Sequence, residues 1–126
     1  MAATITTTYA SLVGVNVLKG KYIALFLQSG KEVSGGGYVR QQLPAFTVSS
    51  DTTNIYLKNS AVITFPIATS DWATVSDMIS KIKIYDSATG GNVLAEVDLP
   101  SPKPCYTGDQ IIFPVDSFLI TLPITT

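Results

Sequence analysis

Strict alternation of apolar and polar residues predicts a β-hairpin from Lys81 to Leu99. Residues 81–85 and 92–99 both alternate, and the turn-forming segment Ser87-Ala88-Thr89-Gly90-Gly91 separates them. A shift of one residue would place charges on the apolar face, so the pattern also predicts a register. The expected pairs are Lys81 with Asp98, Ile82 with Val97, Lys83 with Glu96, and Ile84 with Ala95.

Other β-prone segments predict further strands. Residues 21–28 are apolar on both faces, which is typical of a central strand. Shorter strands are expected at residues 38–48 with a kink at Pro44, and at 55–57, 61–65, 110–113 and 117–122. Residues 49–54 read as a polar loop. Many short strands separated by turns predict a mainly all-β fold, an antiparallel β-sandwich or jelly-roll-like arrangement, with residues 1–126 in a single domain.

The N-terminal region leaves two alternatives open. Residues 1–8 are rich in threonine and fit an extended arm or an edge strand. Residues 9–18 show no clear polar face. A short N-terminal helix, capped by Thr8 and ended by Gly20, and a strand fit them about equally well.

Pro100, Pro102 and Pro104 follow the hairpin directly. Proline has no backbone N–H, so this segment is excluded from a central strand. The spacing of the three prolines predicts an extended crossover between sheets.

Three consecutive glycines, Gly35 to Gly37, lie between two predicted strands. Glycine can adopt positive φ or admit the close approach of another group. The spacing does not match a phosphate-binding loop, so we interpret the segment as a tight connection. Arg40 is the only arginine and follows directly. Two interpretations stay open for it: pairing with a local carboxylate or with carbonyls of the glycine turn, or contact with a neighbouring subunit.

The composition mainly indicates which kinds of partner the chain can have. Charged residues make up 13% of the chain and hydrophobic residues 46%, and the mean hydropathy is +0.33. Such a composition indicates that neighbouring subunits or a scaffold cover part of the surface. The formal net charge of −1 gives no support for binding nucleic acid or acidic lipid. The longest apolar run, Tyr22 to Leu27, is too short to cross a membrane.

We expect no catalytic, cofactor-binding or metal site, and therefore no enzyme. The chain has no histidine, so Cys105 has no histidine to activate it and is interpreted as a structural thiol. Glu96 and Asp98 share a strand face, but the lysines expected opposite them favour an ion-pair ladder over a calcium or acid–base pair. Residues 86–92 are interpreted as a hairpin turn, since they carry too few carboxylates for a calcium loop. The six tyrosines and Trp72 are assigned to core and interface packing in preference to a sugar-binding groove.

Several motifs between Tyr22 and Leu122 resemble, in order, a family of small tailed-bacteriophage virion structural proteins whose members are often labelled tail fibre proteins. The motifs are residues 32–41 (EVSGGGYVRQ), 59–66 (NSAVITFP), 68–72 (ATSDW), 84–94 (IYDSATGGNVL), and Gly108-Asp109 followed by an apolar strand. The resemblance implies a small β-sandwich module of the virion, made in the host cytoplasm and without enzymatic activity.

From this resemblance we expect a capsid decoration (cement) protein that stabilises the head lattice. A fibre would need an attachment region, a trimeric shaft and a receptor tip, whereas 126 residues are expected to form one globule. The alternative is a tail fibre, tail-tip or baseplate component that binds the host surface. The expected partners are the major capsid protein or tail proteins, and further copies of the chain as a homotrimer, with the capsid surface favoured over the tail. Candidate interface residues are Thr4, Ile5, Tyr38, Arg40, Pro102 and Pro104.

Overall fold

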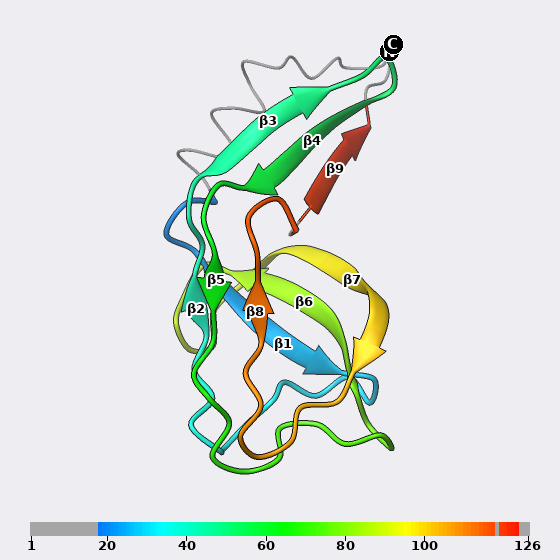
Figure 1. The fold of residues 1–126 in the computed structure, drawn as a ribbon. Helices are drawn as coiled ribbons and strands as arrows, with labels where there is room; N and C mark the ends of the chain where they lie inside the picture. Colours follow the sequence, from blue (N-terminus) through cyan, green and yellow to red (C-terminus); the bar gives the residue numbers. More distant parts are fainter. Residues whose placement is uncertain (1–17, 118, 124–126) are drawn as a thin grey trace. The chain divides into compact units, whose positions relative to one another are not determined.

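The computed structural model describes residues 18–117 and 119–123 (Figure 1). All regular elements within these ranges are β-strands, and the pairs between them are antiparallel, which confirms the all-β prediction. The strands are β1 (Tyr22–Leu27), β2 (Gln41–Gln42), β3 (Phe46–Ser50), β4 (Asn54–Asn59), β5 (Ile63–Thr64), β6 (Ile79–Tyr85), β7 (Val93–Lys103), β8 (Ile112–Phe113) and β9 (Leu119–Pro123). The expected N-terminal arm and the alternatives for residues 9–17 lie outside the described residues.

The described strands fall into two compact units. The first contains the sheet β3-β4-β9, and the second contains the sheet β2-β1-β6-β7. β5 pairs with β8, and the division between the units passes within both of these strands. The single domain and the sandwich arrangement stay predictions.

The β6–β7 hairpin has the register that the sequence predicts. The pairs are Lys81 with Asp98, Ile82 with Val97, Lys83 with Glu96, and Ile84 with Ala95. Isoleucines 82 and 84 are buried, while the lysines and carboxylates lie on the opposite face. Burial of one face therefore fixed the register, as expected for a strand whose faces differ in polarity.

The proline segment departs from its prediction. β7 continues through Pro100 and Pro102 to Lys103 as an edge strand, so the expected crossover between sheets is wrong, whereas exclusion from a central strand is confirmed. Lys103 pairs with Ile79, so residues 99–102 of β7 face Ser80 alone. Both prolines therefore lie where the register of the pair shifts, in an irregular part of an edge strand, and such positions tolerate residues without an N–H.

β1 is the central strand that its continuous apolar run predicts. It pairs with β2 on one side and β6 on the other, and Ile23, Ala24 and Leu25 have no exposed surface. Further buried side chains of this unit complete its core: Phe26, Val33, Phe65, Ala68, Trp72, Ala73, Ile79, Ile82, Ile84 and Cys105. The core of this unit therefore lies around the four-stranded sheet next to the glycine-rich loop, residues 32–40, whereas Leu43, Phe46, Ile55 and Leu57 are buried in the other unit.

Several predicted strands are shorter in the structure, among them 110–113, of which only Ile112–Phe113 is a strand. The segment 38–48 is divided at Pro44 into β2 and β3, and only Ile63–Thr64 of the segment 61–65 is a strand. The carbonyl of Ala61 is engaged by the side chain of Asn59, whose Nδ2 donates to the carbonyls of Ala61 and Pro114, both at 2.8 Å, and β5 begins only after this contact, at Ile63. The predicted loop 49–54 narrows to residues 51–53, where Asp51 Oδ1 accepts the N–H groups of Thr53 and Asn54.

Candidate functional site

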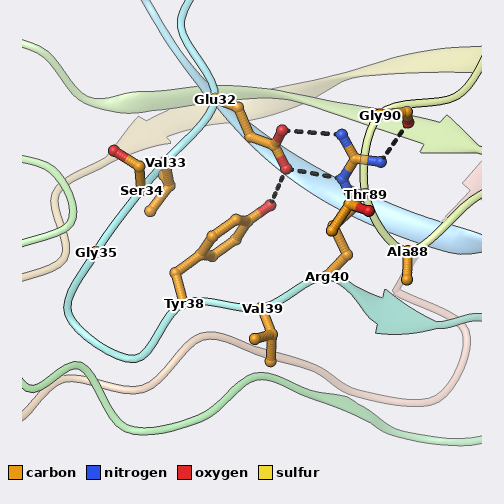
Figure 2. A pocket seen from close by; sticks show the side chains of 10 residues that line it. All are labelled: Glu32, Val33, Ser34, Gly35, Tyr38, Val39, Arg40, Ala88, Thr89 and Gly90. Carbon is orange, nitrogen blue, oxygen red and sulfur yellow. Dashed lines mark hydrogen bonds and ion pairs between the residues drawn. The ribbon is translucent and has the colours of Figure 1, made fainter.

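A pocket of about 400 Å³ lies between the glycine-rich loop and the turn of the β6–β7 hairpin (Figure 2). It is lined by residues 32–35, 38–40 and 88–90, all within one compact unit. In Figure 2 the side chains of Tyr38 and Arg40 both point toward Glu32, whereas Val39 points away from it. These three polar side chains form the centre of the site.

Glu32 and Arg40 form a two-point ion pair. Arg40 Nε donates to Glu32 Oε2 and Arg40 Nη2 donates to Glu32 Oε1, both at 2.9 Å. The Arg40 side chain is only 7% exposed and that of Glu32 is 26% exposed. A bidentate, partly desolvated pair of this kind fixes both position and direction of the two groups.

The Nη1 group of Arg40 binds the hairpin turn. Its Nη1 donates to the carbonyl oxygens of Ser87 at 2.9 Å and Gly90 at 2.8 Å, and its guanidinium carbon lies 3.8 Å from the centroid of the Tyr85 ring. The guanidinium therefore ties the loop of residues 32–40 to the hairpin turn. Of the two interpretations of Arg40, the structure shows pairing with a local carboxylate, and the carbonyls that it binds belong to this turn instead of the glycine turn.

Tyr38 connects the ion pair to the core. Its hydroxyl donates to Glu32 Oε2 at 2.7 Å and accepts the N–H of Leu25 at 3.0 Å. Its ring stacks on Phe65 with centroids 6.1 Å apart and meets Trp72 edge-on at 5.4 Å. The phenol thus satisfies a backbone donor of the central strand and holds the carboxylate in place.

The three glycines are required by the geometry of this loop. Gly35, Gly36 and Gly37 have φ of 75°, 59° and 79°, and the N–H of Tyr38 closes the turn on Gly35 O at 3.0 Å. Gly36 O accepts hydrogen bonds from Trp72 Nε1 and the N–H of Thr69, both at 2.9 Å. Both properties expected of glycine, positive φ and close approach, are therefore confirmed here.

The electrostatics of the site do not favour proton transfer. Burial opposes ionisation of Glu32, but the hydrogen bonds from Arg40 and Tyr38 and the positive charge of Arg40 outweigh it, so the pKa of Glu32 is lowered. Burial and the neighbouring carboxylate strongly raise the pKa of Tyr38. The site consequently holds an ionised carboxylate, a guanidinium and a neutral phenol at pH 7.

The other candidate groups occupy structural positions. Lys81 Nζ lies 3.4 Å from Glu96 and 3.8 Å from Asp98, and Lys83 Nζ lies 3.4 Å from Glu96, which confirms the ion-pair ladder. Cys105 is fully buried, and its backbone forms an isolated antiparallel β-bridge with that of Ala73. The residues that the structure describes include no group of three or more potential metal ligands. Over the same ranges, no helix is long and apolar enough to cross a membrane.

The structure brings together two of the residues predicted for an interface. Tyr38 and Arg40 lie in the pocket, Pro102 is exposed on the edge strand and Pro104 is half-buried after it, while Thr4 and Ile5 lie outside the described residues. Their interface role stays a prediction. Sequence reasoning missed Glu32, although a carboxylate shortly before the only arginine was an available signal.

Comparison with protein-family models identifies a match that covers residues 19–121, to the family described as Podophage GP4 fiber I protein gp80. No curated protein matches the chain. The matched range includes the glycine-rich loop, the whole β6–β7 hairpin and every residue that lines the pocket.

Proposed function

The chain belongs to the Podophage GP4 fiber I protein gp80 family, and from this membership we propose that it is a non-enzymatic structural module of a virion fibre. Membership makes the chain a bacteriophage virion structural protein and confirms the resemblance seen in its motifs. The family description favours the fibre over the capsid decoration role that the sequence analysis preferred. The head lattice remains the second location to be tested.

The absence of catalysis is part of the proposal, and the engaged carboxylates support it. Glu32 is bound by Arg40 and Tyr38, Glu96 by two lysines, and Asp51 by the turn that it closes. A general acid or base would need a carboxyl group whose pKa lies near neutrality, whereas the pKa values of these three carboxyl groups are lowered. Their arrangement suits a rigid scaffold.

Exposed apolar side chains support contacts with neighbouring virion proteins. In the unit that carries the pocket, Ile67 and Val75, which do not line it, are 57% and 71% exposed. Contact with a partner would remove this apolar surface from water. Other copies of the chain, in a homotrimer, and further fibre or tail proteins are the proposed partners.

Fractionated virions test the proposal. Heads and tails from disrupted particles are separated and probed with an antibody against the chain, and light scattering gives the mass of the isolated protein. The fibre role predicts signal in the tail fraction and a mass of three chains. Signal confined to heads would support the decoration role, and absence of the chain from purified particles would refute both.

A further inference from the structure

We propose that the pocket between the glycine-rich loop and the β6–β7 turn binds a neutral, hydroxyl-bearing ligand of the size of one sugar ring. The inference deepens the fibre role and rests on it for its biological meaning, since a fibre meets the host surface, where neutral sugars are displayed. The binding chemistry itself follows from Glu32, Arg40 and the residues around them.

Glu32 retains one acceptor position. A carboxylate offers about four lone-pair sites. Oε2 accepts from Tyr38 and from Arg40 Nε, whereas Oε1 accepts only from Arg40 Nη2 among the described residues. Because the Glu32 side chain is 26% exposed and lines the pocket, Oε1 can accept one further hydrogen bond from a ligand hydroxyl.

The charges of the site disfavour ionic ligands. The carboxylate of Glu32 is neutralised by a guanidinium at hydrogen-bond distance, so little attraction is left for a cation. Four of the five guanidinium N–H groups of Arg40 are hydrogen-bonded and its side chain is only 7% exposed, so little of this positive charge is accessible to an anion. A ligand that donates a hydrogen bond without carrying charge fits this balance.

The remaining lining suits a sugar ring. Val33, Val39 and Ala88 supply apolar surface for C–H groups, and Thr89 supplies a hydroxyl that has no hydrogen-bond partner in the described part of the chain. The volume of about 400 Å³ falls within the range of about 300–1,000 Å³ that is typical of small-ligand sites. The ion pair and the glycine turn hold these groups in place before binding, which lowers the entropic cost of association.

A titration of the isolated full chain, followed by ¹⁵N–¹H NMR, tests the inference. The neutral probes are methyl α-D-glucopyranoside, methyl β-D-galactopyranoside and N-acetyl-D-glucosamine, and the charged probes are D-glucuronate and D-glucosamine. We expect at least one neutral probe to shift the amides of residues 32–40 and 87–91 in a saturable manner, with the charged probes bound at least about tenfold more weakly. No saturable shift with any neutral probe, or equal binding of the charged probes, would overturn the proposal.

Two variants, each with a control variant, locate the binding site. Ala88→Trp fills the pocket from an exposed turn position and should abolish the shifts, while Ala61→Trp, at an exposed position outside the pocket, should preserve them. Thr89→Val, which removes only a hydroxyl, should weaken binding by about tenfold, and the exposed Thr52→Val should not. Unchanged binding in Ala88→Trp, with the amide spectrum of β1 intact, would refute this site. Because the isolated chain is used, the result is independent of where the protein lies in the virion.

Discussion

Arg40 and Glu32 are joined at two points, Nε to Oε2 and Nη2 to Oε1, each at 2.9 Å. The same guanidinium reaches the carbonyls of Ser87 and Gly90, so one side chain connects the glycine-rich loop to the hairpin turn. This connection adds to the hydrogen bonds that Gly36 O accepts from Trp72 and Thr69, and it is the contact that fixes the loop against the hairpin turn.

Replacing Arg40 tests that dependence. Arg40→Ala leaves a partly buried carboxylate without its cation and two carbonyls without their donor, so we expect a loss of about 2–3 kcal/mol in the free energy of unfolding. Urea denaturation measures the loss. Lys31→Ala is the matched control, since Lys31 is exposed and has no ion pair among the described residues, and it should change stability by less than about 0.5 kcal/mol. Equal stability of the two variants would contradict the stabilising role of the Arg40 contacts with Glu32, Ser87 and Gly90.

Comparing alanine variants of Gly35 and Gly36 distinguishes the cost of backbone strain from the cost of a steric clash. A Cβ at Gly36 would lie 2.5 Å from Ser70 Oγ and 2.8 Å from Trp72 Nε1, whereas a Cβ at Gly35 meets nothing within 4 Å. Both residues have positive φ, so each alanine variant costs about 1–2 kcal/mol in strain. Gly36→Ala should cost about a further 1–3 kcal/mol from overpacking. Thermal unfolding of both variants gives the comparison, and equal melting temperatures would show that Trp72 does not contact the turn as described.

Acid should weaken the site. The pKa of Glu32 is lowered from its ordinary value of 4.5, so its contribution to stability is complete above pH 4.5 and is lost as the pH falls through the folded-state pKa. The variant Glu32→Gln lacks this contribution at every pH. Its free energy of unfolding should therefore fall less steeply than that of the parent protein below pH 4.5. Parallel curves for the two proteins in urea titrations across this range would contradict the pKa shift.

The thiol of Cys105 should be unreactive in the folded protein. The side chain has no exposed surface, and burial together with the charges of Asp109 and Asp71 raises its pKa. Ellman's reagent needs an accessible thiolate. We expect no reaction in buffer and one equivalent in denaturing urea, measured by absorbance. Rapid modification of the native protein would show that the core around Cys105 opens.

The sequence predicted the hairpin register well because two independent constraints coincided there. Ile82 and Ile84 had to face the core, and Lys81 and Lys83 had to face carboxylates. The proline segment was misassigned because an irregular part of an edge strand tolerates proline, and the pattern alone does not tell an edge from a crossover.

The contact of Arg40 with the hairpin turn was harder to predict, because the residues that form it are distant in the sequence. Ser87 and Gly90 lie 47 and 50 residues after Arg40, and their carbonyls carry no sequence signal. The local sequence predicted that Gly35 to Gly37 could adopt positive φ, and it showed that a single arginine follows them. Only the fold of the four-stranded sheet shows that the loop and the hairpin turn meet.

A reconstruction of the intact virion tests the central claim most directly. The fibre role predicts that the β2-β1-β6-β7 sheet, with its long β7 edge strand, fits density in a fibre attached to the tail. Density for this unit on the head shell alone would contradict that role.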